Sequence, residues 1–273
     1  MDKIWNKLLK LNEEYISLKL SDMVDYNKFY LYSIITHSTA IEGSTLTELD
    51  TQLLFDDGIT AKGKSIEHHL MNQDLKDAYF FAMKEAVDKA SITPDFLKRL
   101  NTILMKRTGD VHNTMGGSFD SSKGEEYRLC GVTAGYGGKS YMNYQKVPDK
   151  VSELCDEISK RIDVGKVIED VYNLSFDAHF NLVTIHPWVD GNGRTARLLM
   201  NYMQFYNKVV PTKIFKEDRA EYISSLIESR EQESTTPFRE FMAKQHEKNL
   251  RTEITAYRKE QRKNKKNGLK LLF

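Results

Sequence analysis

Apolar residues spaced three and four positions apart constrain the fold of this chain more than any other feature. The clearest case is residues 167–185, where the apolar side chains at helical spacing are Val171, Leu174, Ala178, Leu182 and Ile185. That spacing places them on one face of an α-helix. Similar spacing recurs over long stretches of the 273 residues, and the chain has only 5 prolines to interrupt it. The sequence therefore predicts a mainly α protein.

Residues suited to helix ends divide the chain into predicted helices. Thr47 and Gly58 can cap the two ends of one helix, and Thr93 followed by Pro94 can begin another. The predicted helices cover residues 3–20, 24–42, 47–58, 65–90, 93–106, a stretch from 148, 167–185 and 195–206. The chain has no internal repeat and no linker-like break before residue 250. One helical domain is the simplest interpretation.

Residues 108–146 differ from the rest in being rich in glycine and lacking a sustained helical period. Two runs with strand-like composition, residues 126–133 (EYRLCGVT) and 140–147 (SYMNYQKV), flank a glycine-rich turn. The sequence predicts that these two runs pair as a short β-hairpin.

Composition limits the class of protein. The formal net charge is +1, so the chain has no overall field to attract nucleic acid or a membrane surface. Cys130 and Cys155 are too few for a disulfide framework and lack zinc-site spacing. No run approaches the roughly 18 apolar residues of a membrane-spanning helix. We therefore expect a soluble cytoplasmic protein with no membrane partner.

The stretch HPWVDGNGRTAR, residues 186–197, concentrates groups that can handle a phosphate and a proton. Pro187 stops the preceding helix, so His186 lies at a helix end, where its side chain can enter a cleft. Gly191 and Gly193 allow the positive φ values of a tight anion-binding turn. The next helix begins at once, so its free N–H groups point toward whatever the loop encloses.

The charged residues of this stretch fit the same interpretation. Arg194 and Arg197 lie three apart, so they share a helix face and can fork onto phosphate oxygens. Asp190 offers a hard oxygen ligand suited to Mg²⁺ that also carries phosphate oxygens and waters. A neutral histidine such as His186 can act as a general base near pH 7. Composition alone leaves two interpretations open, a phosphate site and an ordinary turn.

The stretch resembles the Fic family signature, His-x-Phe-x-Asp/Glu-Gly-Asn-Gly-Arg-x-x-Arg. Trp188 stands where the family usually has phenylalanine, and the matching positions are His186, Asp190, Gly191, Asn192, Gly193, Arg194 and Arg197. The resemblance implies a Fic-type helical bundle with a small β-hairpin flap over the active site, here near residues 127–147. It also implies a protein adenylyltransferase, which transfers AMP from Mg·ATP to a Ser, Thr or Tyr hydroxyl of a target protein.

The resemblance assigns roles by position. His186 would be the base that takes the proton from the target hydroxyl, and Asp190 would hold Mg²⁺, with Mn²⁺ as an alternative metal. Arg197 would hold the γ-phosphate of ATP. The remaining phosphate contacts would come from Gly191, Asn192, Gly193 and Arg194. Glycine at position 193 favours adenylylation over the kinase-like transfer of the Doc branch, which generally has lysine there.

A second motif, STAIEG, resembles the Fic inhibitory motif Ser/Thr-x-x-x-Glu-Gly/Asn at Ser38, Glu42 and Gly43. The resemblance implies that Glu42 pairs with Arg197, so that Arg197 cannot hold the γ-phosphate and ATP binds in an unproductive pose. Ser38 lies one turn earlier on the same helical face and would support this pairing. We therefore expect residues 24–43 to form an inhibitory helix and the enzyme to be largely inactive as purified.

The predicted organisation has three parts: N-terminal helices at 1–60, a Fic core at 61–250 and a basic tail at 251–273. Seven lysines and arginines lie between residues 258 and 270. Nucleic acid is not an expected partner, because no aromatic residues interleave with these charges. In the flap, Arg128, Tyr141 and Tyr144 are candidates to contact a ligand, although packing is the commoner role of such side chains.

Several alternatives stay open. The site could serve a deAMPylating hydrolase, in which Glu42 would position a water, or a Doc-like phosphotransferase. It could also belong to a nucleotide- or nucleic-acid-binding module that performs no chemistry. The resemblance does not identify the target protein, and the enzyme itself is one candidate. Members of the family often self-associate, so a homo-oligomer is a further expectation.

Overall fold

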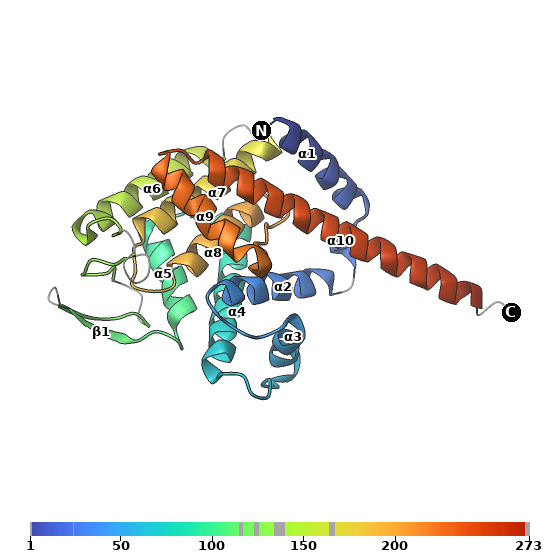
Figure 1. The fold of residues 1–273 in the computed structure, drawn as a ribbon, viewed down its shortest axis with the longest axis horizontal. Coiled ribbons are helices and arrows are strands. Elements are labelled where there is room, and N and C mark those ends of the chain that lie inside the picture. Colours follow the sequence, from blue (N-terminus) through green and yellow to red (C-terminus); the bar gives the residue numbers. More distant parts are fainter. Residues whose placement is uncertain are drawn as a thin grey trace.

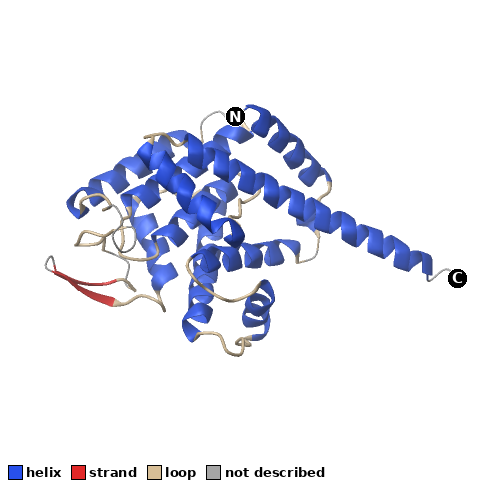
Figure 2. Ribbon diagram, viewed as in Figure 1, coloured by secondary structure: helices blue, strands red, loops and turns tan. Residues whose placement is uncertain are grey.

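The structure, a computed structural model, describes residues 2–23, 25–114, 117–122, 126–133, 140–163 and 167–270. Helices dominate these residues, and the one small sheet lies at an edge of the molecule (Figures 1 and 2). The prediction of a mainly α fold is confirmed. The α-helices are α1 (Asp2–Ser17), α2 (Tyr26–Ile41), α3 (Glu48–Asp57), α4 (Ile66–Val87), α5 (Pro94–Met105), α6 (Val147–Arg161), α7 (Ile168–Ile185), α8 (Asn192–Tyr206), α9 (Arg219–Glu231) and α10 (Thr236–Lys270).

Helix ends follow the capping residues in the sequence. Thr47 accepts a hydrogen bond from the backbone N–H of Asp50 and forms a capping box at the start of α3, and Gly58 ends that helix with φ 69°. Thr93 caps α5 in the same way. Helix α8 begins at Asn192, three residues before the predicted start at Thr195, because Gly191 takes the N-cap position with φ 80°.

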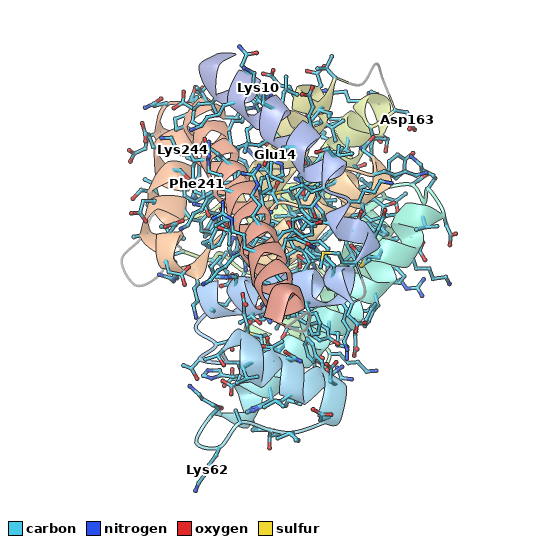
Figure 3. All side chains as sticks on the ribbon, turned by 90° about the vertical axis from the view of Figure 1, so that its right-hand side faces the viewer. Lys10, Glu14, Lys62, Asp163, Phe241 and Lys244 are labelled. Carbon is cyan, nitrogen blue, oxygen red and sulfur yellow. The ribbon has the colours of Figure 1, made fainter. Side chains whose placement is uncertain are left out.

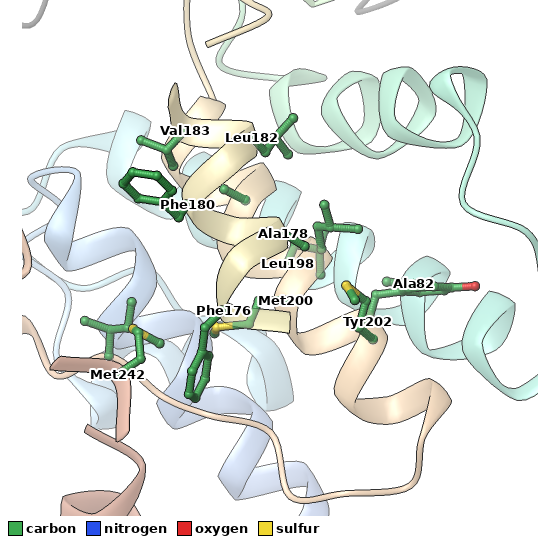
Figure 4. Packing of buried hydrophobic residues seen from close by; sticks show 14 of the residues in the cluster. Ala82, Phe176, Ala178, Phe180, Leu182, Val183, Leu198, Met200, Tyr202 and Met242 are labelled. Atoms are coloured by element: carbon green, nitrogen blue, oxygen red, sulfur yellow. The ribbon is translucent and has the colours of Figure 1, made fainter. Parts of the chain in front are cut away.

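Helices α7 and α8 form the centre of the molecule. Figure 4 shows their buried side chains filling the space between the two helices, with Ala82 of α4 and Met242 of α10 beside them. Every residue of the predicted apolar stripe on α7 is buried. Phe176 and Phe180, on other faces of α7, are buried as well. Burial on several faces holds the end of α7, and therefore the loop that follows it, in a fixed position.

The remaining helices surround this pair. Helix α2 packs against α3, α4 and α8, while α9 and α1 pack along α10. Figure 3 shows α1 beside α10, where Glu14 of α1 forms an ion pair with Arg258. Residues 251–270 continue α10 past the predicted boundary of the tail, and Ile254 is buried. The C-terminal part of this helix extends beyond the other elements in Figure 1.

Within the described residues, the predicted pairing of residues 126–133 with 140–147 is seen at one antiparallel bridge, and the regular sheet lies earlier in the chain. The two-stranded antiparallel sheet consists of β1 (Val111–Thr114) and β2 (Gly117–Asp120). Within residues 127–147, the described part has one isolated bridge, between Thr133 and Ser140, and a short 3-10 helix, Tyr144–Lys146. Residues 134–139, the centre of the predicted turn, lie outside the described residues. Two main-chain carbonyls near the bridge accept hydrogen bonds from a buried arginine side chain instead of from a neighbouring strand.

Among the described residues, no helix combines the length and the apolarity that crossing a membrane requires.

Candidate active site

His186 is the first residue after α7 and adopts a left-handed conformation, with φ 53° and ψ 64°. Its Nδ1 lies 3.3 Å from the carbonyl oxygen of Val183. A carbonyl oxygen only accepts hydrogen bonds, so this contact places the ring proton on Nδ1 and leaves the Nε2 lone pair free. Burial lowers the pKa of His186 to about 4. The side chain is therefore neutral at pH 7 and can accept a proton.

The loop between α7 and α8 is fixed by its own residues. The side-chain Oδ1 of Asn192 accepts from the backbone N–H of Trp188 at 3.0 Å, and its Nδ2 donates to the carbonyl of the same residue at 2.8 Å. Both the oxygen and the nitrogen of the amide thus make a hydrogen bond inside the loop, which holds Asn192 in place at the start of α8. Trp188 is buried, so the larger aromatic residue fits where phenylalanine is usual.

Gly191 has a position that other residues could not take without strain. Its φ is 80°, and a Cβ atom there would lie 2.7 Å from Nδ2 of Asn101 and 2.9 Å from Sδ of Met105. Asn101, on α5, also donates to Oγ1 of Thr195 at 3.1 Å. Helix α5 therefore packs directly against the start of α8, where the first N–H groups have no partner within the helix.

Arg194 lies in the first turn of α8 and is buried. Its Nη2 is 3.3 Å from Sδ of Met105 and 3.4 Å from Oδ2 of Asp190. Within the described part of the chain, its Nε and Nη1 are buried with no hydrogen-bond partner. Buried guanidinium N–H groups without partners are unfavourable unless an anion completes them. The start of α8 therefore offers a site for a phosphate.

Asp190 differs from its neighbours in being exposed, with 61% of its side chain accessible. Its Oδ1 accepts from the backbone N–H of Gly191 at 2.6 Å. The described residues bring no three His, Cys, Asp or Glu side chains together as a metal site. One accessible carboxylate beside a phosphate site fits Mg²⁺, which is commonly held by one or two carboxylates together with substrate phosphates and waters.

Arg197 joins α8 to the end of α2. Its Nη2 donates to Oε1 of Glu42 at 2.5 Å and to the carbonyl of Ser38 at 3.0 Å, and its Nε donates to Oγ of Ser38 at 2.8 Å. Arg197 is almost fully buried. Gly43, with φ 102°, lets the chain turn directly after Glu42. The structure thus brings the second motif and the last arginine of the loop into direct contact.

Electrostatics favour the ionised form of this pair. Burial by itself would raise the pKa of Glu42, but the positive charge of Arg197, followed by those of Arg194 and Arg219, holds the pKa below its usual value. Glu42 in turn raises the pKa of Arg197 against the opposite effect of burial. The carboxylate therefore stays charged at pH 7 and occupies the side of the site that Arg197 faces.

Gly193 provides the space for that carboxylate. A Cβ atom at this position would lie 2.6 Å from Oε1 of Glu42 and 3.2 Å from Nη1 of Arg197. Gly193 therefore lies directly beside Glu42 of the second motif.

Four residues near the site were missed or given a minor role by sequence reasoning. Asn101 and Tyr222 lie on helices, in no recognisable motif, and Tyr222 interacts with Arg197. Arg128 donates its side-chain N–H groups to main-chain carbonyls, one of them that of His186 at 2.8 Å. Tyr141, a candidate ligand contact, stacks on the His186 ring with centroids 3.8 Å apart.

Comparison with known proteins supports the sequence motif. The Fic/DOC family model matches residues 91–204, which include the whole loop 186–197. Protein adenylyltransferase Fic of Drosophila melanogaster is 31% identical over 220 residues, covering 79% of this chain and 40% of that protein. Protein adenylyltransferase fic-1 of Caenorhabditis briggsae is 29% identical over 229 residues, 84% of this chain and 42% of that protein. This chain thus spans about two fifths of the curated relatives it matches.

Solved structures share the fold. Fic-1 of C. elegans superimposes with a TM-score of 0.75 at 24% identity, over 95% of this chain and 73% of that chain. A Fic-domain signaling protein of Bacteroides thetaiotaomicron gives 0.77 at 23% identity, over 92% and 96% of the two chains. At these identities the likeness concerns the fold alone. The family model, which includes the whole loop 186–197, thus shows that residues 91–204 of this chain are a Fic/DOC domain.

Proposed function

We propose that this protein is an adenylyltransferase that transfers AMP from ATP to a hydroxyl of a target protein, and that Glu42 restrains this activity. The proposal rests chiefly on one juxtaposition. A neutral histidine, His186, shares a loop with a helix start whose buried arginine, Arg194, lacks partners for two of its nitrogen atoms. The similarity to proteins named protein adenylyltransferase supports ATP as the co-substrate.

The transfer requires one proton acceptor. The target hydroxyl oxygen forms a bond to the α-phosphorus of ATP, and the bond from that phosphorus to the oxygen bridging the α- and β-phosphates breaks. The hydroxyl proton passes to Nε2 of His186, and pyrophosphate leaves with the electron pair of the broken bond. Such a step depends on positioning and charge stabilisation more than on covalent participation of the protein.

Binding of the triphosphate falls to the start of α8. The N–H groups of its first turn and the guanidinium of Arg194 would contact phosphate oxygens. Asp190 would hold Mg²⁺, or Mn²⁺, which when bound offsets the negative charge of the phosphates. Arg197 would hold the γ-phosphate once its contact with Glu42 is broken. That contact, at 2.5 Å, is the basis for proposing a restrained enzyme.

The experiment uses ATP labelled at the α-phosphate or at the γ-phosphate. It compares the wild type, Glu42→Gly and the double variant Glu42→Gly/His186→Ala, and it follows label attached to protein. We expect α-label to appear with Glu42→Gly, to be weak with the wild type and to disappear with the double variant.

Other results would favour the alternatives. Label from the γ-phosphate alone would indicate a Doc-like phosphotransferase. Label from the α-phosphate that forms and is then removed only while Glu42 is present would indicate a deAMPylating hydrolase. If Glu42→Gly, supplied with candidate target proteins, binds ATP but transfers neither label, the site is a binding module.

A further inference from the structure

Arg128 is the largest side chain among those that are almost completely buried, at 1% exposure. Its Nε donates to the carbonyl of His186 at 2.8 Å and its Nη1 to that of Cys130 at 2.7 Å, while Nη2 donates to that of Met142. Its backbone N–H donates to the carbonyl of Pro187 at 2.9 Å. Arg128 therefore connects the covering segment, which is defined here as the described residues 127–133 and 140–142, to the first two residues of the loop 186–197.

The same segment covers the imidazole. The ring of Tyr141 stacks on that of His186, with centroids 3.8 Å apart and planes inclined by 19°. The backbone N–H of Tyr141 donates to the carbonyl of Val132 at 3.0 Å. The central carbon of the Arg230 guanidinium lies 5.4 Å from the centroid of the Tyr141 ring. Because Met142 is bound by Arg128, the residue that precedes it is held close to His186.

The left-handed conformation of His186 gives such support a role. A residue other than glycine is strained in this region, so contacts that hold the neighbouring peptide units stabilise the conformation. Here Arg128 captures the carbonyl groups of His186 and Pro187, the two peptide units that follow the strained residue. Burial lowers the pKa of Arg128, so placing a guanidinium here is itself unfavourable and the contacts must offset it.

We propose that Arg128 is a positioning residue for the transfer step, which ties the covering segment to the loop and keeps the Tyr141 ring on the His186 imidazole. Arg128 does not touch the reacting atoms; it acts through the backbone of His186 and through Tyr141. The kinetic part of this inference rests on the proposed adenylyl transfer, whereas the structural part does not.

The structural part has a direct spectroscopic readout. A ring stacked on an imidazole shifts the resonances of the imidazole protons upfield, so the His186 ring protons in the metal-free protein report whether Tyr141 covers them. We expect this upfield shift in the parent protein and in Tyr141→Phe, which keeps the ring. It should be lost in Tyr141→Leu and in Arg128→Lys, which keeps the charge but cannot make the three forked contacts.

The kinetic part uses self-labelling from α-labelled ATP in the Glu42→Gly background. Arg128→Lys and Tyr141→Leu should each lower kcat by about 10- to 100-fold, since small displacements of catalytic groups have effects of this size. The KM for ATP should change less than about twofold, because the phosphate contacts lie on α8. The double variant should fall no further than the more affected single variant, as expected for residues that act through one another.

Arg239→Lys is the matched control. Arg239 forks onto Asp177 and joins α10 to α7 away from the loop, so this variant reports a loss of stability alone. The proposal is overturned if Arg128→Lys keeps the parent His186 shift and kcat and merely lowers the melting temperature, as Arg239→Lys does. If Arg128→Lys does not fold, Tyr141→Leu provides the test. An unchanged His186 resonance and an unchanged kcat in Tyr141→Leu would refute the proposal.

The two parts can fail separately. Loss of the His186 shift in Arg128→Lys and Tyr141→Leu, with no labelling from ATP in any variant, would leave the positioning role standing and remove the proposed function. Normal labelling from ATP, with the His186 resonances unchanged in Arg128→Lys and Tyr141→Leu, would support the proposed function and refute the positioning role.

Discussion

The loop 186–197 and the covering segment (residues 127–133 and 140–142) meet at His186, but they are held in different ways. The loop is fixed by neighbours in sequence, with the side chain of Asn192 bonded to Trp188 four residues earlier and Gly191 at a positive φ. The covering segment is fixed from a distance, by Arg128 reaching residues 58 positions away. The loop therefore has local restraints in addition to its contacts with Arg128, whereas the covering segment depends mainly on the contacts of Arg128 and on the stacking of Tyr141 against His186.

The largest expected effect comes from comparing a substitution of the proposed base in the loop with a substitution in the covering segment. His186→Ala in the Glu42→Gly background should lower transfer by about 10²- to 10⁴-fold, because it removes the general base. Tyr141→Phe, in the covering segment, should leave transfer within about twofold, since the stacked ring remains. Rates of α-label incorporation measure both. Residual activity of His186→Ala close to that of its parent would show that another group takes the proton.

A glycine in each region provides the next test. Gly191→Ala should destabilise the fold by about 1–3 kcal/mol, because it strains a positive φ and places a Cβ 2.7 Å from Nδ2 of Asn101. Gly131→Ala, in the covering segment, should be nearly neutral, since no atom lies within 4 Å of its added Cβ. Urea unfolding gives both free energies. Equal losses would mean that the loop is not held more tightly than the covering segment.

The smallest effect concerns pH. Burial lowers the pKa of His186 to about 4, so the base should stay neutral down to about pH 5, and transfer by Glu42→Gly should fall only as the pH approaches 4. Exposure of the ring in Tyr141→Leu should move that midpoint upward, toward the ordinary histidine value of about 6.5. A rate profile from pH 4 to 8 measures both. A midpoint near 6.5 in the parent would contradict a buried base.

Local restraints explain what the sequence could predict. Helix boundaries at Thr47, Gly58 and Thr93, and the turn at Gly191, depend on residues close in the chain, so their positions are readable. The contact between Glu42 and Arg197 is not local, and only the family motif pointed to it. For Asn192 the motif suggested a phosphate contact, which stays a prediction, and the structure adds that its amide bonds to Trp188 inside the loop.

The missed features share a tertiary origin. The runs at 126–133 and 140–147 have strand composition, but the carbonyls of Cys130 and Met142 bond to the side chain of Arg128. The sheet forms instead at β1 and β2. Nothing in the sequence indicates that Arg128 would be buried, because an isolated arginine is ordinarily exposed. Asn101 and Tyr222 likewise become part of the site only through helix packing.

The central claim, that Glu42 restrains the enzyme through Arg197, is tested most directly by the dependence of one substitution on the other. The measurement is the rate of α-label transfer from ATP in wild type, Glu42→Gly, Arg197→Ala and the double variant. With Arg197 present, Glu42→Gly should raise the rate about 10- to 100-fold, the range of a charge-assisted hydrogen bond. With Arg197→Ala, removing Glu42 should have little effect. An equal rise in both backgrounds would contradict the account.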